Sequence, residues 1–265
     1  MFRCWTNLWP SLEGSSESFP DVFDFHCHLD LYHPGEAFLT QIEAAEFILA
    51  VTTTPLAVEG NKLRFGSFPG VRIGCGLHPE LVSARCDELP LLLDQIRSEV
   101  YVGEVGLDGS PAHRANLTEQ IRVFISIVRR CHSSGGRVVS IHSRGAVKQI
   151  LDILEENRSV GYPVFHWFAG TPQQALRAVK LGGYFSVNDA AVLSRSGRQW
   201  IGAVPKSRIL TETDGPFCEI RSRALWPGET LGAVSVLGEI WNIPFDEALA
   251  QIRENSLSFV AGVDG

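Results

Sequence analysis

Two histidines stand two residues apart in the segment VFDFHCH, residues 22–28. Side chains at positions i and i+2 of a strand point to the same face, with Cα atoms about 7 Å apart, so His26 and His28 can bind one ion together. The intervening Cys27 then faces the other way, and we expect it to be a packed thiol. Because such a pair also arises by chance among eight histidines in 265 residues, the pair alone does not establish a metal site.

Further ionisable residues lie at the ends of other apolar runs, and they are His78, Glu104, His142, His166 and Asp214. With the histidine pair they supply too many imidazoles for a single acid-base pair, but they suit one or two divalent cations. A cluster of carboxylates without cations is disfavoured by repulsion and by loss of solvation. The alternative is that some are ordinary core histidines, that Asp214 caps a helix near residue 216, and that His78 occupies a turn.

These residues belong to short runs rich in β-branched and aromatic residues, which predict strands. Eight runs occur, at residues 22–28, 46–53, 71–78, 100–106, 137–142, 162–167, 182–188 and 207–214. The clearest helices predicted between and after them cover 117–136, which Gly135 ends, 171–183, which Thr171 caps, and one or two helices within 229–262. The alternation predicts an α/β fold, a somewhat distorted (β/α)8 TIM barrel. An open doubly wound sheet is the lesser alternative, since no G-x-G-x-x-G motif follows the first strand.

In such a barrel all parallel strands deliver their last residues to one rim, so we expect the ionisable residues to share one mouth. We expect residues 22–265 to form this single barrel domain, because about 250 residues suffice for one. Residues 1–21 precede the first predicted strand. We expect them to form a flexible N-terminal extension, unless translation begins at Val22.

The chain carries 23 Lys and Arg against 30 Asp and Glu, and this formal charge of −7 excludes a surface that is basic all over. Residues 177–223 are locally basic, with eight Lys or Arg against four acids, which indicates either a DNA-facing surface or an ordinary solvated one. Six cysteines without a C-x-x-C pair indicate neither a disulfide framework nor a zinc knuckle. Without a signal peptide or a membrane-spanning run, we expect a cytoplasmic protein with no membrane partner.

Six motifs, in this order, resemble those of the TatD family of metal-dependent DNases, which are amidohydrolase-type barrels. They are DFHCHLD, GLHPE, GEVGLDG, SIHSRGA, VFHWFAG and LTETDGPF, and the resemblance covers residues 22–262. Each motif alone is weak, but six in order are highly specific. The chain is most similar to the QatD branch, the TatD-like component of Qat anti-phage cassettes. The segments that carry this similarity are VTTTP, LHPE, HWFAG and TETDGPF.

The resemblance implies two divalent metal ions, of Mg, Mn or Zn. His26 and His28 are similar to the family's ligands of the first ion. Glu104 is in the position of the carboxylate that bridges to the second ion. His142 and His166 are in the positions that hold this second ion.

The resemblance also implies the catalytic and substrate-binding residues. Asp214 sits on the first ion and takes the proton of the attacking water, so Asp214 and Glu104 are the expected catalytic residues. His78 and Arg144 are similar to residues that address the phosphate of the substrate. Glu212, two residues before Asp214, either supports a ligand or is an ordinary buried acid.

The function that the resemblance implies is phosphodiester hydrolysis in DNA, single-stranded or end-exposed, as the nuclease of an anti-phage Qat system with protein partners from the cassette. One alternative is an amidohydrolase-type enzyme for a small cyclic amide or ester, and another is a cassette component that mainly docks a partner. Two departures from the TatD pattern, Gly109 and Trp167, alter the expected mouth. Trp167 and Phe168 either stack on an end base or belong to the core.

Overall fold

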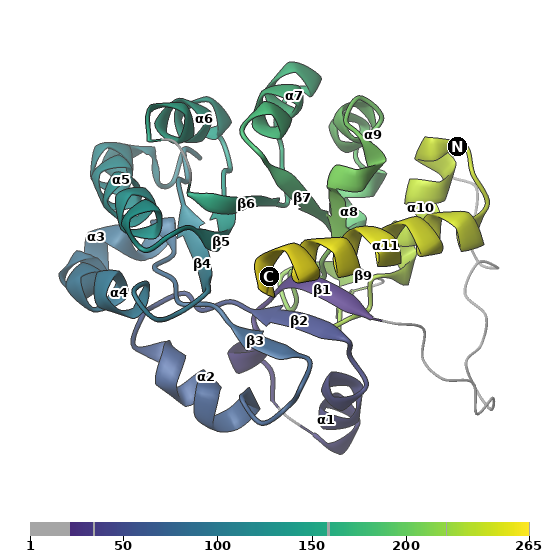
Figure 1. Cartoon of the computed structure of the whole chain (residues 1–265), viewed down its shortest axis with the longest axis horizontal. Coiled ribbons are helices and arrows are strands. Elements are labelled where there is room, and N and C mark those ends of the chain that lie inside the picture. Colours follow the sequence, from purple (N-terminus) through teal and green to yellow (C-terminus); the bar gives the residue numbers. More distant parts are fainter. Residues whose placement is uncertain (1–21, 34, 158–159, 221, 265) are drawn as a thin grey trace.

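The computed structural model describes residues 22–264 apart from 34, 158–159 and 221, and all eight predicted strands are present in it (Figure 1). They are β1 (Phe23–Cys27), β2 (Phe47–Ala50), β3 (Val71–Ile73), β4 (Tyr101–Gly106), β5 (Arg137–His142), β6 (Gly161–His166), β7 (Tyr184–Val187) and β8 (Ile209–Thr211). Every pairing among these eight strands is parallel. The extension predicted for residues 1–21 lies outside the described residues.

Two seams join a three-stranded sheet, β1–β2–β3, to a five-stranded sheet, β4–β5–β6–β7–β8. At one seam the chain beyond β3 meets β4 through a parallel bridge between Cys75 and Val102. At the other, Thr211 Oγ1 donates to the Phe23 carbonyl oxygen at 2.9 Å, and the Asp214 amide donates to the His26 carbonyl oxygen at 2.9 Å. The predicted (β/α)8 TIM-barrel fold is confirmed, with irregular seams in place of a continuous ladder.

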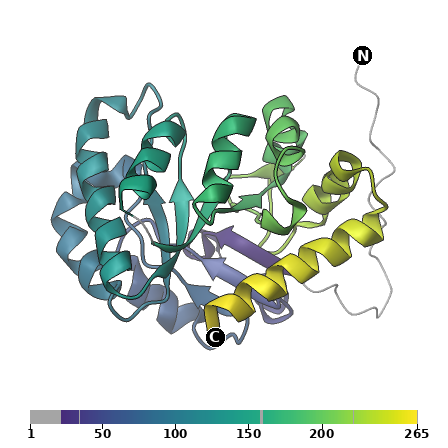
Figure 2. The same cartoon turned by 45° about the horizontal axis from the view of Figure 1, so that its top comes forward.

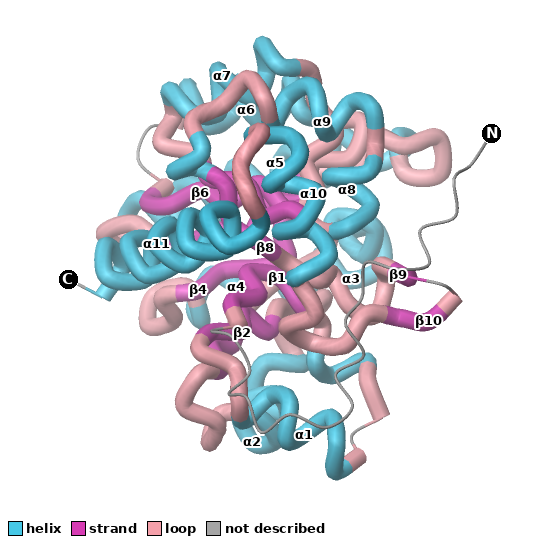
Figure 3. The backbone as a smooth tube through the Cα atoms, turned by 90° about the vertical axis from the view of Figure 1, so that its right-hand side faces the viewer, coloured by secondary structure: helices cyan, strands magenta, loops and turns pink. Residues whose placement is uncertain are grey.

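Helices surround the strands on the outside (Figures 1 and 3). They are α1 (Glu36–Glu43), α2 (Ala57–Phe65), α3 (Val82–Arg85), α4 (Leu89–Gln95), α5 (Leu117–Ser133), α6 (Val147–Glu156), α7 (Pro172–Lys180), α8 (Asp189–Leu193), α9 (Arg195–Ile201), α10 (Leu231–Trp241) and α11 (Phe245–Asp264). The predicted helices correspond to α5, α7 and the pair α10 and α11. Gly135 follows α5 with a φ of +87°, and Thr171 Oγ1 accepts a hydrogen bond from the Gln174 amide at the start of α7.

Aromatic side chains fill the barrel at the end where the strands begin. Phe25 stacks on Phe47 with ring centroids 4.7 Å apart. Phe259 of α11 packs edge-on against Phe25 at 5.3 Å and against Tyr184, the first residue of β7, at 4.8 Å. Helix α11 therefore crosses this end of the barrel (Figure 2). The carboxyl ends of the strands are left for a site.

Strands β3 and β8 are shortened most relative to the prediction, since β3 ends at Ile73 and β8 at Thr211. The residues that follow these strands do not continue the regular parallel pairing. They form hydrogen bonds with other segments at the carboxyl end of the barrel instead. The His78 amide donates to the Thr53 carbonyl oxygen at 2.9 Å, for example. A two-stranded hairpin follows β8 and was not predicted, with β9 at Glu219–Ile220 and β10 at Arg223–Ala224.

Candidate metal centre and active site

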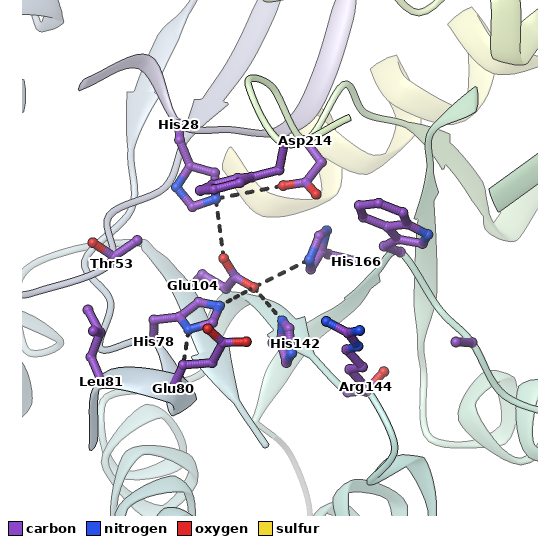
Figure 4. Close-up of a pocket in the computed structure, with 14 residues that line it drawn as sticks. His28, Thr53, His78, Glu80, Leu81, Glu104, His142, Arg144, His166 and Asp214 are labelled. Carbon is purple, nitrogen blue, oxygen red and sulfur yellow. Dashed lines mark hydrogen bonds and ion pairs between the residues drawn. The ribbon is translucent and has the colours of Figure 1, made fainter. Parts of the chain in front are cut away.

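A cavity of about 520 Å³ lies at the carboxyl ends of the barrel strands. Seven of the eight residues predicted for the site line it, and they are His28, His78, Glu104, His142, Arg144, His166 and Asp214 (Figure 4). The eighth, His26, is fully buried against the same cluster, with its ring centroid 5.1 Å from that of His28. Residues far apart in the sequence meet at one rim because the parallel strands all end there.

Glu104 lies at the centre of the cluster, and its two carboxylate oxygens face different imidazoles (Figure 4). Oε2 is 3.4 Å from His26 Nε2 and 3.3 Å from His28 Nε2. Oε1 is 2.8 Å from His142 Nδ1 and 3.3 Å from His166 Nε2. Each oxygen thus faces a different pair of imidazoles, although the rings of His26 and His166 stack on each other with centroids 3.8 Å apart. A carboxylate placed in this way can serve one cation with each oxygen.

Asp214 completes the group on the Oε2 side. Its Oδ1 is 3.6 Å from His26 Nε2 and 3.7 Å from His28 Nε2. The residue has a φ of +48°, and the hydrogen bond from its amide to the His26 carbonyl oxygen fixes this turn beside β1. His26, His28 and Asp214 lie close enough together to hold one metal ion.

Carboxylates behind the site orient two imidazoles. Glu212 Oε1 lies 3.2 Å from His166 Nδ1, and Asp108 Oδ2 lies 2.8 Å from His142 Nε2. Because a carboxylate accepts hydrogen bonds, each of these ring nitrogens carries the proton of the neutral imidazole. Once these rings are neutral, the nitrogens that face Glu104, His166 Nε2 and His142 Nδ1, would offer lone pairs to a cation, as metal-binding histidines do.

His78 has the opposite arrangement, because the nitrogen that faces Glu104 is the one that carries the proton. Its Nδ1 accepts a hydrogen bond from the Glu80 amide at 3.2 Å, so Nε2 carries the proton of the neutral ring. Nε2 lies 3.2 Å from Glu104 Oε1 and donates to it. His78 therefore presents a hydrogen-bond donor to the cavity, although His78, Glu104 and His142 also lie close enough together to hold an ion.

Glu212 is a fully buried supporting residue. Besides His166, its Oε1 accepts hydrogen bonds from the Trp167 amide at 3.1 Å and from Asn188 Nδ2 at 3.0 Å. Its Oε2 accepts one from the Ser186 hydroxyl. Glu212 thus fixes the chain at the end of β6 to the chain that leaves β7.

Asp108 is the supporting residue that sequence analysis missed. Burial alone would raise its pKa, but hydrogen bonds from His142 and Ser110 hold the pKa of the Asp108 carboxyl below its usual value. Its position could have indicated this role, because Asp108 stands four residues after Glu104 and two residues beyond the carboxyl end of β4.

The charges of the cluster influence one another strongly. Burial would raise the pKa of Glu104, but the surrounding imidazoles, with His78 foremost, hold it well below its usual value. Burial would lower the pKa of His142, but hydrogen bonds to Asp108 and Glu104 raise it to about 9. Burial raises the pKa of Asp214 well above its usual value. Without cations the cluster therefore holds protons, and cations must displace these protons when they bind.

The cluster fits divalent cations. His26 Nε2 is buried and has no hydrogen-bond partner among the described residues. A buried polar atom without a partner costs free energy, and a cation would satisfy this one. Imidazole and carboxylate together are ligands for Zn²⁺, Mn²⁺ and related ions.

The outer part of the cavity holds Arg144 and Trp167. Arg144 is exposed, and its guanidinium makes no hydrogen bond or ion pair with the residues that the structure describes. Trp167 is 36% exposed, whereas Phe168 is buried against Phe185 and Trp200. Phe168 is therefore a core residue, and of the two aromatic residues considered for base stacking only Trp167 reaches the site.

The local surplus of positive charge in residues 177–223 is largely neutralised in space. Three of its arginines pair with acids, Arg177 with Asp152 and Glu155, Arg198 with Glu239, and Arg223 with Glu229. All four acids lie outside the segment. The balance counted along the chain therefore does not describe a basic surface, because the fold brings remote acids to these arginines.

The family model of the TatD-related DNases matches residues 23–260, nearly the whole barrel. The chain belongs to this family. Its TatD-type relatives include the deoxyribonuclease TATDN3 of Homo sapiens, 28% identical over 91% of each chain. They also include the uncharacterized metal-dependent hydrolase YcfH of Escherichia coli K12, 30% identical over 74% of this chain and 78% of that one.

Solved structures carry the same TatD-type fold. YjjV, a TatD homolog from Escherichia coli, has a TM-score of 0.73 at 24% identity and covers 89% of this chain and 96% of its own. A TatD-family hydrolase from Entamoeba histolytica has a TM-score of 0.74 at 16% identity, with 91% and 98% covered.

Membership of the TatD family makes the chain a hydrolase that acts on ester bonds, and its relatives are metal-dependent hydrolases. Among the described residues, no helix combines the length and the hydrophobicity that crossing a bilayer requires.

Proposed function

We propose that the chain is a metal-dependent deoxyribonuclease that hydrolyses phosphodiester bonds with two divalent ions. The observation that carries this proposal is the placement of Glu104, whose two oxygens face different imidazole nitrogens. A shared carboxylate between two cations is typical of enzymes that cleave phosphate esters. The name of the family supports DNA as the substrate.

The two ions would be held on opposite sides of Glu104. On the Oε2 side the ligands would be His26, His28 and Asp214, which form one compact group. On the Oε1 side they would be His142 and His166. The supporting hydrogen bonds favour this division, because they leave the lone pairs of these last two rings facing Glu104.

Divalent ions bound there would polarise the attacking water and offset the negative charge that develops on the phosphate. Asp214 is the proposed proton acceptor. Its Oδ1 faces His26 and His28, while its Oδ2 makes no hydrogen bond with a described residue and can take a proton from water. Asp214 lines the cavity, so it can release this proton directly into the cavity.

His78 and Arg144 are the proposed phosphate-binding residues. His78 presents Nε2–H to the cavity because its Nδ1 is occupied by the Glu80 amide. Arg144 follows β5 and offers a planar guanidinium whose donors are not used by other described residues. A guanidinium can bind two oxygens of one phosphate, which would orient the diester for attack.

The proposed substrate is single-stranded or end-exposed DNA. A cavity of about 520 Å³ has the volume of a small-ligand site, so it suits a nucleotide or two and not a base-paired duplex. We also propose that the nuclease acts in an anti-phage Qat system. The support for this role is the resemblance of VTTTP, LHPE, HWFAG and TETDGPF to the QatD branch.

The test of the proposed reaction compares two substrate panels. Purified protein with Mg²⁺ or Mn²⁺ should cleave labelled single-stranded oligonucleotides, and Glu104→Ala and Asp214→Ala should not, although their circular dichroism matches the parent. Hydrolysis of dihydropyrimidines or lactones with the oligonucleotides left intact would favour the amidohydrolase alternative. For the defence role, a cassette carrying Glu104→Ala should lose protection in plaque assays, and full protection would contradict it.

A further inference from the structure

Two exposed aromatic rings stand beside different imidazoles of the cluster. Phe217 is 58% exposed and Trp167 is 36% exposed, and both line the cavity. Phe217 meets the ring of His28 edge-on, with centroids 5.1 Å apart. Trp167 meets the ring of His166 edge-on at 6.4 Å. Since His28 faces one oxygen of Glu104 and His166 faces the other, each group of imidazoles has one exposed aromatic ring beside it.

The backbone holds Trp167 in a conformation that a bulky residue rarely adopts. Its φ is +38°, in the left-handed region. The Trp167 amide donates to Glu212 Oε1 at 3.1 Å, and the same oxygen contacts His166 Nδ1. The carboxylate that orients a proposed ligand therefore also fixes the backbone that carries the indole. Unfavourable backbone conformations of this kind concentrate at functional sites.

We propose that Trp167 and Phe217 stack on the bases of the two nucleotides that flank the scissile phosphate, one ring to each base. The proposal rests on the proposed DNase function. A diester placed beside Glu104, between the two groups of imidazoles, extends one nucleoside toward each ring. Stacking on an aromatic side chain accepts every base, but the base must be unpaired and drawn out of its own stack. The pair of rings therefore selects unpaired DNA and tolerates any sequence.

The experiment removes the aromatic ring from the protein and the base from the substrate, each separately. The substrates are single-stranded oligonucleotides in which methylphosphonates block every linkage except one. The nucleotide on the 5′ or the 3′ side of that linkage carries its base or is abasic. Trp167→Ala and Phe217→Ala should each lower kcat/KM on the full substrate by about 5- to 150-fold. Each variant should equal the parent enzyme on one abasic substrate, and the two variants should respond to opposite sides.

Two further variants serve as controls. Trp167→Phe keeps an aromatic face and should retain most of the activity, which separates stacking from general damage to the site. Phe245→Ala removes a ring that is 41% exposed at the start of α11, outside the residues that line the cavity, and should change nothing. The metal content of every variant should match that of the parent protein.

Losses that are equal on full and abasic substrates would overturn the proposal, as would two variants that respond to the same side. In both cases the parent enzyme still cuts DNA, so the DNase function stands. If the parent enzyme with Mg²⁺ or Mn²⁺ leaves every oligonucleotide intact, the DNase function fails and the stacking proposal fails with it.

Discussion

Glu104→Gln tests the two-ion arrangement most directly. Glutamine has the shape of glutamate, but it has one oxygen acceptor and one NH2 donor group in place of two oxygens. In the parent protein Oε2 faces His26 and His28, and Oε1 faces His142 and His166. The amide oxygen can serve one side only, and the amide protons then repel a cation on the other. We therefore expect two bound ions in the parent protein and one in the variant.

The donor groups on each side set the expected loss. Apart from Glu104, the Oε2 side keeps three donors. On the Oε1 side the lone-pair donors among the described residues are His142 and His166, because His78 Nε2 carries its proton toward Oε1. Two protein ligands are fewer than the three of typical catalytic sites, so the Oε1 side should lose its ion first. A cation supplies several kcal/mol of transition-state stabilisation, and a loss of about 4 kcal/mol corresponds to about a 10³-fold lower kcat.

The assay pairs metal content with activity. Inductively coupled plasma mass spectrometry of dialysed protein should give two ions per parent chain and one per Glu104→Gln chain, and kcat on an oligonucleotide should fall as stated. Glu80→Gln is the matched control, because Glu80 lines the same cavity but its Oε1 faces His113 Nε2 at 3.4 Å. It should keep both ions. Two ions and unchanged kcat in Glu104→Gln would refute the bridging role.

Three other predictions concern the orienting role of Asp108, the need for a metal ion, and the pH dependence of stability. Asp108→Asn should weaken metal affinity about 10- to 100-fold in calorimetric titrations, because the carboxylate that accepts from His142 Nε2 is lost, and unchanged affinity would contradict its orienting role. EDTA should abolish cleavage and added Mg²⁺ or Mn²⁺ should restore it, whereas cleavage that persists in EDTA would exclude metal dependence. Burial raises the pKa of Asp189 from 3.8 to about 6, so the folded chain takes up a proton between these values and the free energy of unfolding rises as pH falls through them. Asp189→Asn should remove up to about 3 kcal/mol of this dependence in urea titrations, and an unaltered pH profile would show that another group causes it.

The sequence by itself determined the eight barrel strands, some of the helices and the identity of the cluster. Runs of β-branched residues predicted all eight strands because strand propensity and alternation are local properties. Thr171 and Gly135 marked helix ends because capping involves only neighbouring residues. The positions of His26, Glu104 and Asp214 at strand ends sufficed to bring them to one rim, since parallel strands of a barrel all end on the same side.

Only the tertiary structure decided how these groups divide and what supports them. Which oxygen of Glu104 faces which imidazole depends on where β4 lies relative to β1 and β6, which are far away in the sequence, and no local pattern encodes that placement. The roles of Asp108 and Glu212 rest on contacts with His142 and His166 across 34 and 46 positions. The same holds for charge and exposure, because arginines that look unpaired along the chain meet acids only when separate helices and loops pack together.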